Sequence, residues 1–212
     1  LLTVKWPREF ALQSDASDAT HPIVQRVASV DAASQAFDAI AYNKGSAVIR
    51  MLEASLGETG FRVGIRRYVR RYAYDNTVTD QLWSELASAT NRPVIDIAHD
   101  FTLQPGVPLV KAAAGRCESG RTRVTLTQGR FETGTPSPVA LTWRIPVVLQ
   151  AIDSRATTST LLGKDGAPVS VEVGGCGPVV VNAGQTGYFR TQYADADLTR
   201  IRESLGQIAE VD

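Results

Sequence analysis

Gln104-Pro105-Gly106-Val107-Pro108 divides the sequence into two halves of different character. Two prolines and a glycine within four residues cannot continue a helix, so a domain boundary is expected here. Before this stretch, apolar residues recur at intervals of three and four, as on one face of a helix. After it, short alternating runs are typical of strands. The sequence therefore predicts an α+β multidomain chain, with an α-helical lobe followed by an antiparallel β-sandwich.

Four helices are expected before this boundary. The first lies within residues 31–56 and ends at Gly57, a residue type that commonly terminates helices. The second is the arginine-rich segment that follows, whose basic face favours a solvated surface over nucleic-acid contact. A third helix is expected to start with Thr79 as its N-cap. Pro93 suits the first position of a fourth helix.

Strands are expected after the boundary, separated by clusters of glycine and proline about every ten residues. They lie within residues 123–128, 141–150, 169–173, 179–182 and 188–193. Pro146 lies inside one of these patterns, which predicts a sheet edge or a bulge. After Asp195 the pattern becomes helical again, with Asp197 as a candidate cap. We therefore expect residues 1–107 to form the helical lobe, 108–195 the β-sandwich, and 196–212 the first helix of a further helical domain.

The overall composition excludes several classes of protein. Lys+Arg and Asp+Glu balance at 22 each, so no strong field favours nucleic acid or an anionic membrane. No apolar run approaches the roughly 18 residues that span a bilayer. Cys117 and Cys176 both lie in the strand-rich half, where they either pair or remain buried thiols. A disulfide between them would favour a periplasmic or extracellular protein. Without a disulfide, a cytoplasmic location is equally possible.

The residues alone do not form a complete active site. A zinc peptidase typically carries H-E-x-x-H and a more distant glutamate, but this chain has 2 histidines, His21 and His99, far apart in sequence. No C-x-x-C pair and no G-x-S-x-G nucleophile elbow is present. We therefore expect no metal-binding and no cofactor-binding residues in this chain, and each histidine to be either structural or exposed.

One segment nevertheless has a specific likeness. Phe37–Glu53 contains a phenylalanine–aspartate pair, Tyr42, and the pair Lys44-Gly45 at the start of an apolar helix pattern. This arrangement resembles the aminopeptidase N-like zinc metallopeptidases, a gluzincin family. Thr20–Ile23 is similar to the loop before that helix, and Phe101–Pro108 to the passage into the β-sandwich. The likeness covers nearly the whole chain, in the same order.

The resemblance implies a role for Tyr42. In this family the tyrosine before the lysine–glycine pair donates its hydroxyl to the oxyanion that forms when zinc-bound water attacks the scissile carbonyl. Lys44 and Gly45 are expected to shape the start of the helix, Gly45 because a side chain there would crowd a neighbour. Tyr188 and Arg190 are expected to tie the sandwich to the helical domain that follows it.

The sequence departs from the family by lacking the zinc motif, its downstream glutamate and the glycine-rich segment that grips the substrate's amino group. By family order these belong before Leu1, where the chain starts without an initiator methionine or signal-peptide pattern. The resemblance thus implies a fragment of a zinc aminopeptidase, inactive alone. The parent would bind zinc and peptide substrates through the missing segments. Two alternatives stay open: a non-catalytic binding or scaffold module, and a stand-alone hydrolase that binds metal through His21 or His99.

Overall fold

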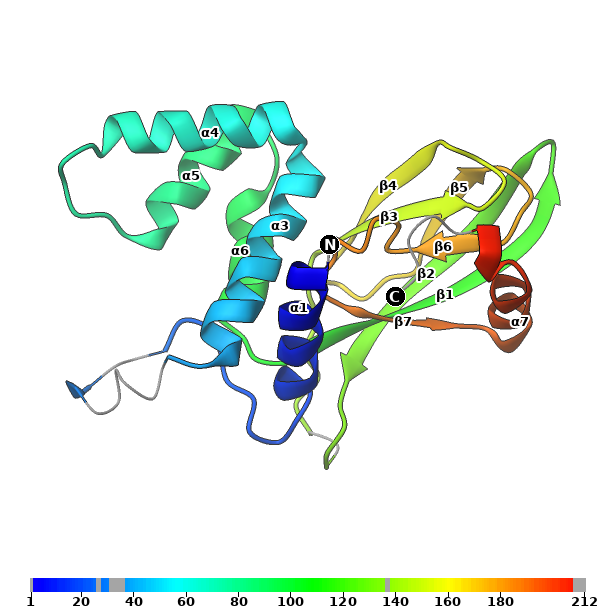
Figure 1. The fold of residues 1–212 in the computed structure, drawn as a ribbon, viewed down its shortest axis with the longest axis horizontal. Helices are drawn as coiled ribbons and strands as arrows, with labels where there is room; N and C mark the ends of the chain where they lie inside the picture. Colours follow the sequence, from blue (N-terminus) through cyan, green and yellow to red (C-terminus); the bar gives the residue numbers. More distant parts are fainter. Residues whose placement is uncertain (1, 26–27, 31–36, 136–137, 208–212) are drawn as a thin grey trace.

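The computed structural model describes residues 2–25, 28–30, 37–135 and 138–207, without the side chains of residues 2–6 and 207. The helices that precede the sheets in sequence lie on one side of the molecule and the two sheets on the other, where the C-terminal helix also lies (Figure 1). The helical elements before the sheets are α1 (Leu2–Asp15), the π-helical turn η1 (Ile40–Lys44), α3 (Gly45–Leu56), α4 (Glu58–Arg71), α5 (Thr79–Thr90) and α6 (Val94–Thr102). The predicted α+β fold class is confirmed.

The helices begin and end within one residue of the capping residues predicted from the sequence. Gly57 separates α3 from α4 with φ +78°, a conformation that glycine adopts without strain, which confirms the predicted C-cap. Thr79 is the first helical residue of α5 and not its N-cap, which is Val78. The side chain of Gln81 accepts the Val78 N–H at 2.9 Å, which is the half of a capping box that the third helical residue supplies, and Val78 itself has no side-chain acceptor. Pro93 is likewise the cap of α6. The first helix was expected within residues 31–56, of which residues 31–36 lie outside the described residues.

Close packing of α4 against α5 depends on Gly64. A Cβ atom at this position would lie 2.7 Å from Leu86 Cδ2 and 2.9 Å from Leu86 Cα, closer than packed carbon atoms can approach. Because one of these atoms belongs to the backbone of α5, a rotamer change cannot relieve the clash. The absence of a side chain at Gly64 therefore allows the two helices to touch.

Gly64→Ala is expected to destabilise the chain by about 1–3 kcal/mol, the usual range for overpacking a close contact. The free energy of unfolding in urea measures this. Gly45→Ala is the matched control, because no described atom outside its own helix turn lies within 4 Å of that Cβ and its φ of −54° is helical. It should gain up to about 1 kcal/mol, as expected when alanine replaces glycine in a helix. Equal losses in both variants would show that the Leu86 contact is not the cause.

The strands form a sandwich of two sheets. They are β1 (Val107–Glu118), β2 (Arg121–Phe131), β3 (Ile145–Ala151), β4 (Thr157–Leu162), β5 (Val169–Gly174), β6 (Val179–Val181) and β7 (Arg190–Tyr193). One sheet has the order β5-β2-β1-β7 and the other β4-β3-β6. Every pairing is antiparallel except β1 with β7, which is parallel. The predicted antiparallel β-sandwich is thus confirmed, with this parallel pair as the exception among the described strands.

The two sheets enclose a core that is shared with the helices. Val110 and Leu126 of one sheet and Leu149 of the other are fully buried in one cluster with Phe101 of α6. Trp143 lies in the same cluster, which confirms that it is a core residue. Pro146 pairs with β4 alone, because β6 reaches only Leu149–Ala151 of β3. One side of Pro146 is therefore a local sheet edge, as predicted.

A disulfide and a final helix close the C-terminal part. Cys117 of β1 is bonded to Cys176, which follows β5, with a Cα–Cα distance of 5.3 Å. Helix α7 (Asp195–Glu203) then packs beside β6, and its Ile201 is buried. Asp197 lies inside the first turn of α7 and not at its cap. Its carboxylate accepts the Ala114 N–H at 2.9 Å and so attaches the helix to β1. Residues 208–212 lie outside the described residues, and the proposed division into three domains stays a prediction.

Helix α6 is joined to the sandwich by a buried carboxylate. Asp100 accepts hydrogen bonds from the backbone N–H and the guanidinium of Arg144, both at 2.9 Å, and from Lys164 Nζ at 2.7 Å. The side chain of Gln104 donates to the Thr142 carbonyl at 2.9 Å beside this pair. The helices and the sandwich are therefore connected by directed polar contacts as well as by a common core. In the described part of the chain, each helix is too short or too polar to traverse a bilayer.

Candidate functional site

Tyr42 lies in the middle of η1, the one-turn π-helix that leads into α3. Asp38 lies just before the turn; its Oδ1 accepts the Ala41 N–H at 2.8 Å and its carbonyl accepts the Tyr42 N–H at 3.1 Å. The Tyr42 side chain is 60% exposed and contacts the ring of Phe37, with 5.8 Å between ring centroids. π-Helical turns are rare and occur frequently at functional sites. The predicted catalytic residue is thus on the surface, on an irregular and well-bonded turn.

His21 and Asp38 form an ion pair beside this turn. Their Nε2 and Oδ2 atoms lie 2.5 Å apart, and the other ring nitrogen of His21 donates to the Pro22 carbonyl at 2.9 Å when protonated. Burial alone lowers the pKa of His21, but the Pro22 and Asp38 hydrogen bonds outweigh it, so the pKa is raised above 6.5. Burial raises the pKa of Asp38, but the Ala41 N–H and His21 outweigh it, so this pKa falls below 3.8. His21 is therefore a structural histidine that braces the start of η1.

The stability that this pair contributes should depend on pH. A raised histidine pKa stabilises the fold below about pH 6.5, and this contribution is lost as pH rises through the folded pKa. A lowered aspartate pKa stabilises the fold above about pH 3.8, and this contribution is lost as pH falls through the folded pKa. His21→Gln should therefore lower the thermal midpoint most near pH 5–6 and least above pH 8. Asp38→Asn should likewise lower the thermal midpoint less above pH 8 than near pH 5–6, because His21 is neutral at high pH. A fall in the thermal midpoint that does not change with pH in either variant would contradict this prediction.

Lys44, two residues after Tyr42, is completely buried. Its ammonium lies 2.9 Å from Asp15 Oδ2, and neither side chain has any exposed surface. A second, longer contact of 3.4 Å runs to the Gln104 carbonyl. Burial lowers the pKa of Lys44, and the adjacent Asp15 carboxylate opposes this by favouring the charged form. The sequence had indicated only that Lys44 shapes the helix start; the structure shows a buried ion pair.

Asp15 accepts four hydrogen bonds from four different segments. Oδ1 receives the Thr20 hydroxyl at 2.5 Å and the Gly106 N–H at 2.9 Å. Oδ2 receives Lys44 and, at 3.1 Å, the hydroxyl of Tyr188. Four donors use all the acceptor sites of a carboxylate. Tyr188 is buried, and burial first and Asp15 second raise its pKa well above 10, so its hydroxyl stays protonated and donates.

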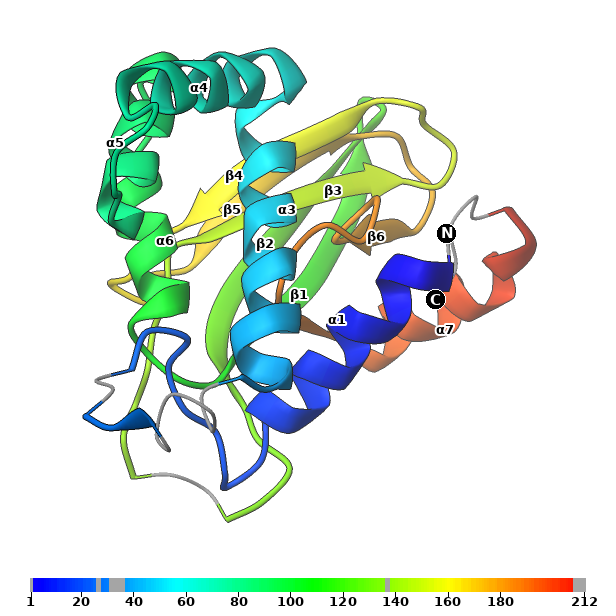
Figure 2. The same ribbon diagram turned by 60° about the vertical axis from the view of Figure 1, so that its left-hand side comes forward.

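Sequence reasoning missed Asp15, although a signal was present. Asp15 follows the buried residues Ala11 and Leu12 at intervals of four and three, so it lies on the apolar face of α1. An acid on such a face needs a partner, and Lys44 is the cation that supplies it. The end of helix α1 packs against η1 at the base of α3, which brings the two residues together (Figure 2).

Two expectations about neighbouring residues are wrong. Gly45 does not avoid a clash, because among the described residues no atom outside its own helix turn lies within 4 Å of a Cβ built there. Tyr188 and Arg190 do not reach forward to α7. Tyr188 bonds to Asp15 and Arg190 Nη1 donates to Glu9 Oε2 at 2.5 Å, so both tie the sandwich back to α1. The parallel pairing of β7 with β1 carries Arg190 to this side of the molecule.

The described side chains do not fit a zinc site. No group of three or more His, Cys, Asp or Glu residues in the described ranges is close enough to hold a metal ion. His21 is paired with Asp38, and His99 Nε2 lies 2.7 Å from Asp80 Oδ1, where it joins α6 to α5. Each histidine therefore has one carboxylate, whereas a catalytic zinc needs three protein ligands.

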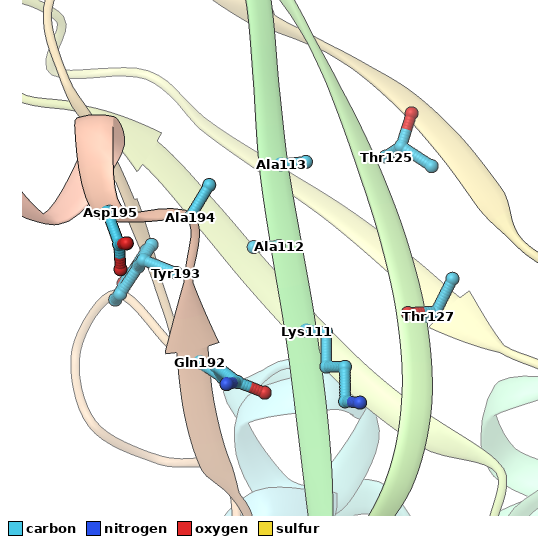
Figure 3. A pocket seen from close by; sticks show the side chains of 9 residues that line it. All are labelled: Lys111, Ala112, Ala113, Thr125, Thr127, Gln192, Tyr193, Ala194 and Asp195. Atoms are coloured by element: carbon cyan, nitrogen blue, oxygen red, sulfur yellow. The ribbon is translucent and has the colours of Figure 1, made fainter.

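A hollow of about 500 Å³ lies on the solvent side of the larger sheet, away from these residues. Its floor is formed by β1, β2 and β7, and Figure 3 shows the side chains of Lys111, Thr127 and Gln192 around it. Asp195 at the start of α7 closes one side. The lining contains one cation, one acid, one amide, two threonine hydroxyls and the ring of Tyr193, with no nucleophile–base pair, so it offers no catalytic arrangement.

The fold and the site together define a class: a helical segment, joined to a β-sandwich, that presents the exposed Tyr42 on a π-helical turn. Residues 2–101 match the Peptidase family M1 domain. The chain is 30% identical to probable aminopeptidase 2 of Sulfurisphaera tokodaii, over 89% of this chain and 23% of that protein. It is also 30% identical to glutamyl aminopeptidase of Mus musculus, over 92% of this chain and 21% of that protein.

A third relative, alanine/arginine aminopeptidase of Saccharomyces cerevisiae, is 30% identical over 94% of this chain and 24% of its own length. Residues 2–101 thus match the peptidase family M1 domain, and the relatives extend the likeness across the sandwich. This confirms the resemblance inferred from the sequence. The chain spans about a quarter or less of the length of these curated relatives.

Proposed function

We propose that this chain is the part of a zinc aminopeptidase that supplies its oxyanion-stabilising tyrosine. The observation that supports this most is the position of Tyr42, exposed on a π-helical turn in a segment that matches a peptidase family. The relatives are aminopeptidases by name, so peptides are the proposed substrates and removal of N-terminal residues the proposed reaction.

In this proposal Tyr42 donates a hydrogen bond to the oxygen of the scissile carbonyl as negative charge develops on it. A neutral donor held in position beforehand stabilises charge that exists only in the transition state, which raises kcat more than it tightens substrate binding. Zinc would activate the attacking water, held by residues of the parent that this chain does not include. The chain alone is therefore proposed to be inactive.

Side-by-side assay of the full-length parent and the 212-residue chain tests the proposal. The parent should release p-nitroaniline from aminoacyl p-nitroanilides, lose this activity on dialysis against a chelator, and regain it with stoichiometric zinc. The 212-residue chain should show no release at equal concentration. A parent that is inactive with zinc supplied would contradict the proposal and favour a binding or scaffold module of the same architecture.

Metal analysis of the isolated chain distinguishes the proposed function from the remaining alternative, a stand-alone metal-dependent hydrolase. A stand-alone hydrolase that uses His21 or His99 requires about one metal ion per chain after purification. The pairing of each histidine with a single aspartate argues against this. Elemental analysis that found stoichiometric zinc in the 212-residue chain would reverse that argument.

We also propose that the protein works in an oxidising compartment, periplasmic or extracellular. The Cys117–Cys176 disulfide supports this, because structural disulfides persist where thiols are not kept reduced. Thiol titration of denatured protein from its native source should find no free cysteine among these two. Two free thiols per chain would contradict the proposal.

A further inference from the structure

The direction of the Tyr42 hydroxyl is set by the backbone that carries it. The side chain is 60% exposed, and its one close aromatic neighbour among the described residues is Phe37, itself 68% exposed. Two exposed rings cannot fix a hydroxyl to within a few tenths of an ångström. The turn beneath them is held much more firmly, because Ile40 and Lys44 at its two ends are both buried.

Lys44 is the stronger of these two anchors. An apolar side chain such as Ile40 tolerates small shifts, whereas a buried ammonium must keep its hydrogen-bond geometry to remain charged. Its partner Asp15 is in turn fixed by the Thr20 hydroxyl, the Gly106 N–H and the Tyr188 hydroxyl. The Asp15 carboxylate therefore connects the start of α3 to α1, to the boundary loop and to the sandwich.

Stability alone is a weak reason for such a pair. Replacement of a buried ion pair by well-packed apolar residues is often neutral or stabilising, so burial of charge is better explained by the specific geometry it imposes. Here the ion pair fixes the position of Lys44, which lies two residues after Tyr42. Misplacement of a catalytic group by about 1 Å can lower a rate about 100-fold, so the orientation of η1 matters to the reaction.

We propose that the buried pair Asp15–Lys44 positions Tyr42 for catalysis, and that Tyr188 of the sandwich acts on the reaction through this pair. The inference rests on the proposed role of Tyr42. Asp15, Lys44 and Tyr188 are positioning residues that do not touch the substrate. The consequence is that a hydroxyl in the sandwich, bonded to Asp15 and not to Tyr42, controls the rate at which the parent enzyme turns over.

The test is Tyr188→Phe in the full-length parent enzyme, which removes a single hydroxyl and leaves the Asp15–Lys44 pair its other donors. We expect kcat to fall about 10-fold with KM unchanged, because the misplaced donor serves the transition state more than the ground state. In a Tyr42→Phe background, the same substitution should change kcat less than twofold, since no hydroxyl remains to be positioned. This loss of effect is the signature of action through Tyr42.

Tyr193→Phe is the matched control. Its hydroxyl accepts the Val181 N–H at 2.8 Å inside the sandwich, so the variant loses a comparable hydrogen bond without touching α1 or η1. It should lower the thermal midpoint but leave kcat unchanged. An unchanged kcat in Tyr188→Phe would overturn the inference, as would an equal fall in both Tyr42 backgrounds. Retained activity in Tyr42→Phe alone would instead overturn the proposed function, so the two failures are distinguishable.

Discussion

Replacement of Tyr42 by phenylalanine in the full-length parent enzyme is expected to lower kcat about 100- to 1,000-fold. This is the usual effect of removing one donor to an oxyanion, and KM should change little because the bond forms mainly in the transition state. Steady-state kinetics on an aminoacyl p-nitroanilide measure both constants. The fold should be unaffected, since the Tyr42 side chain is 60% exposed. Equal thermal midpoints of variant and native enzyme would verify this.

Tyr74→Phe is the control for this experiment. Tyr74 is fully exposed in the connection between α4 and α5, where its φ of 63° places it in the left-handed region. Loss of its hydroxyl should leave kcat unchanged. A Tyr42→Phe enzyme that turns over within threefold of the native rate would rule out the oxyanion role. A fall in kcat with a matching fall in thermal midpoint would point to a folding defect instead.

Much of the fold could be predicted from local pattern. Helices α3 to α6 were expected because their apolar residues recur at helical intervals and because Gly57 and Pro93 mark ends. Helix α1 was not expected, since Pro7 lies inside it and proline normally breaks a helix. Strand β1 was also missed. Its run Ala112-Ala113-Ala114 favours a helix, but pairing with β2 on one side and β7 on the other overrides this propensity.

The candidate site was predicted only where a motif marked it. Tyr42 was found by resemblance, since a tyrosine on a helix start has no distinguishing pattern of its own. Asp15 could not be assigned a partner from the sequence, because the four donors around it come from segments up to 173 residues away. The direction in which Tyr188 and Arg190 point was likewise inaccessible, because it depends on the parallel placement of β7 beside β1. Long-range contacts of this kind become visible only when the chain is folded.

The second large effect is expected at Asp15, where Asp15→Asn should destabilise the 212-residue chain by about 3–5 kcal/mol. This is the typical cost of removing one partner of a buried ion pair. The substitution leaves the Lys44 ammonium with no exposed surface and one long contact of 3.4 Å to the Gln104 carbonyl. Lys44→Met should cost less, because Asp15 retains the Thr20, Gly106 and Tyr188 donors. Urea unfolding of both variants measures the difference.

The double variant Asp15→Asn, Lys44→Met should recover part of the loss, because neither charge then remains buried and unpaired. Asp15→Asn alone should also acquire a pH dependence with a defined sign. Burial already lowers the pKa of Lys44 below 10.5, and without the opposing carboxylate it should fall further. The unfolded chain then binds a proton that the folded chain releases, so the variant's free energy of unfolding rises with pH up to about 10.5. If Asp15→Asn costs less than about 1 kcal/mol and its stability does not change between pH 7 and 10, Lys44 is not held by this pair.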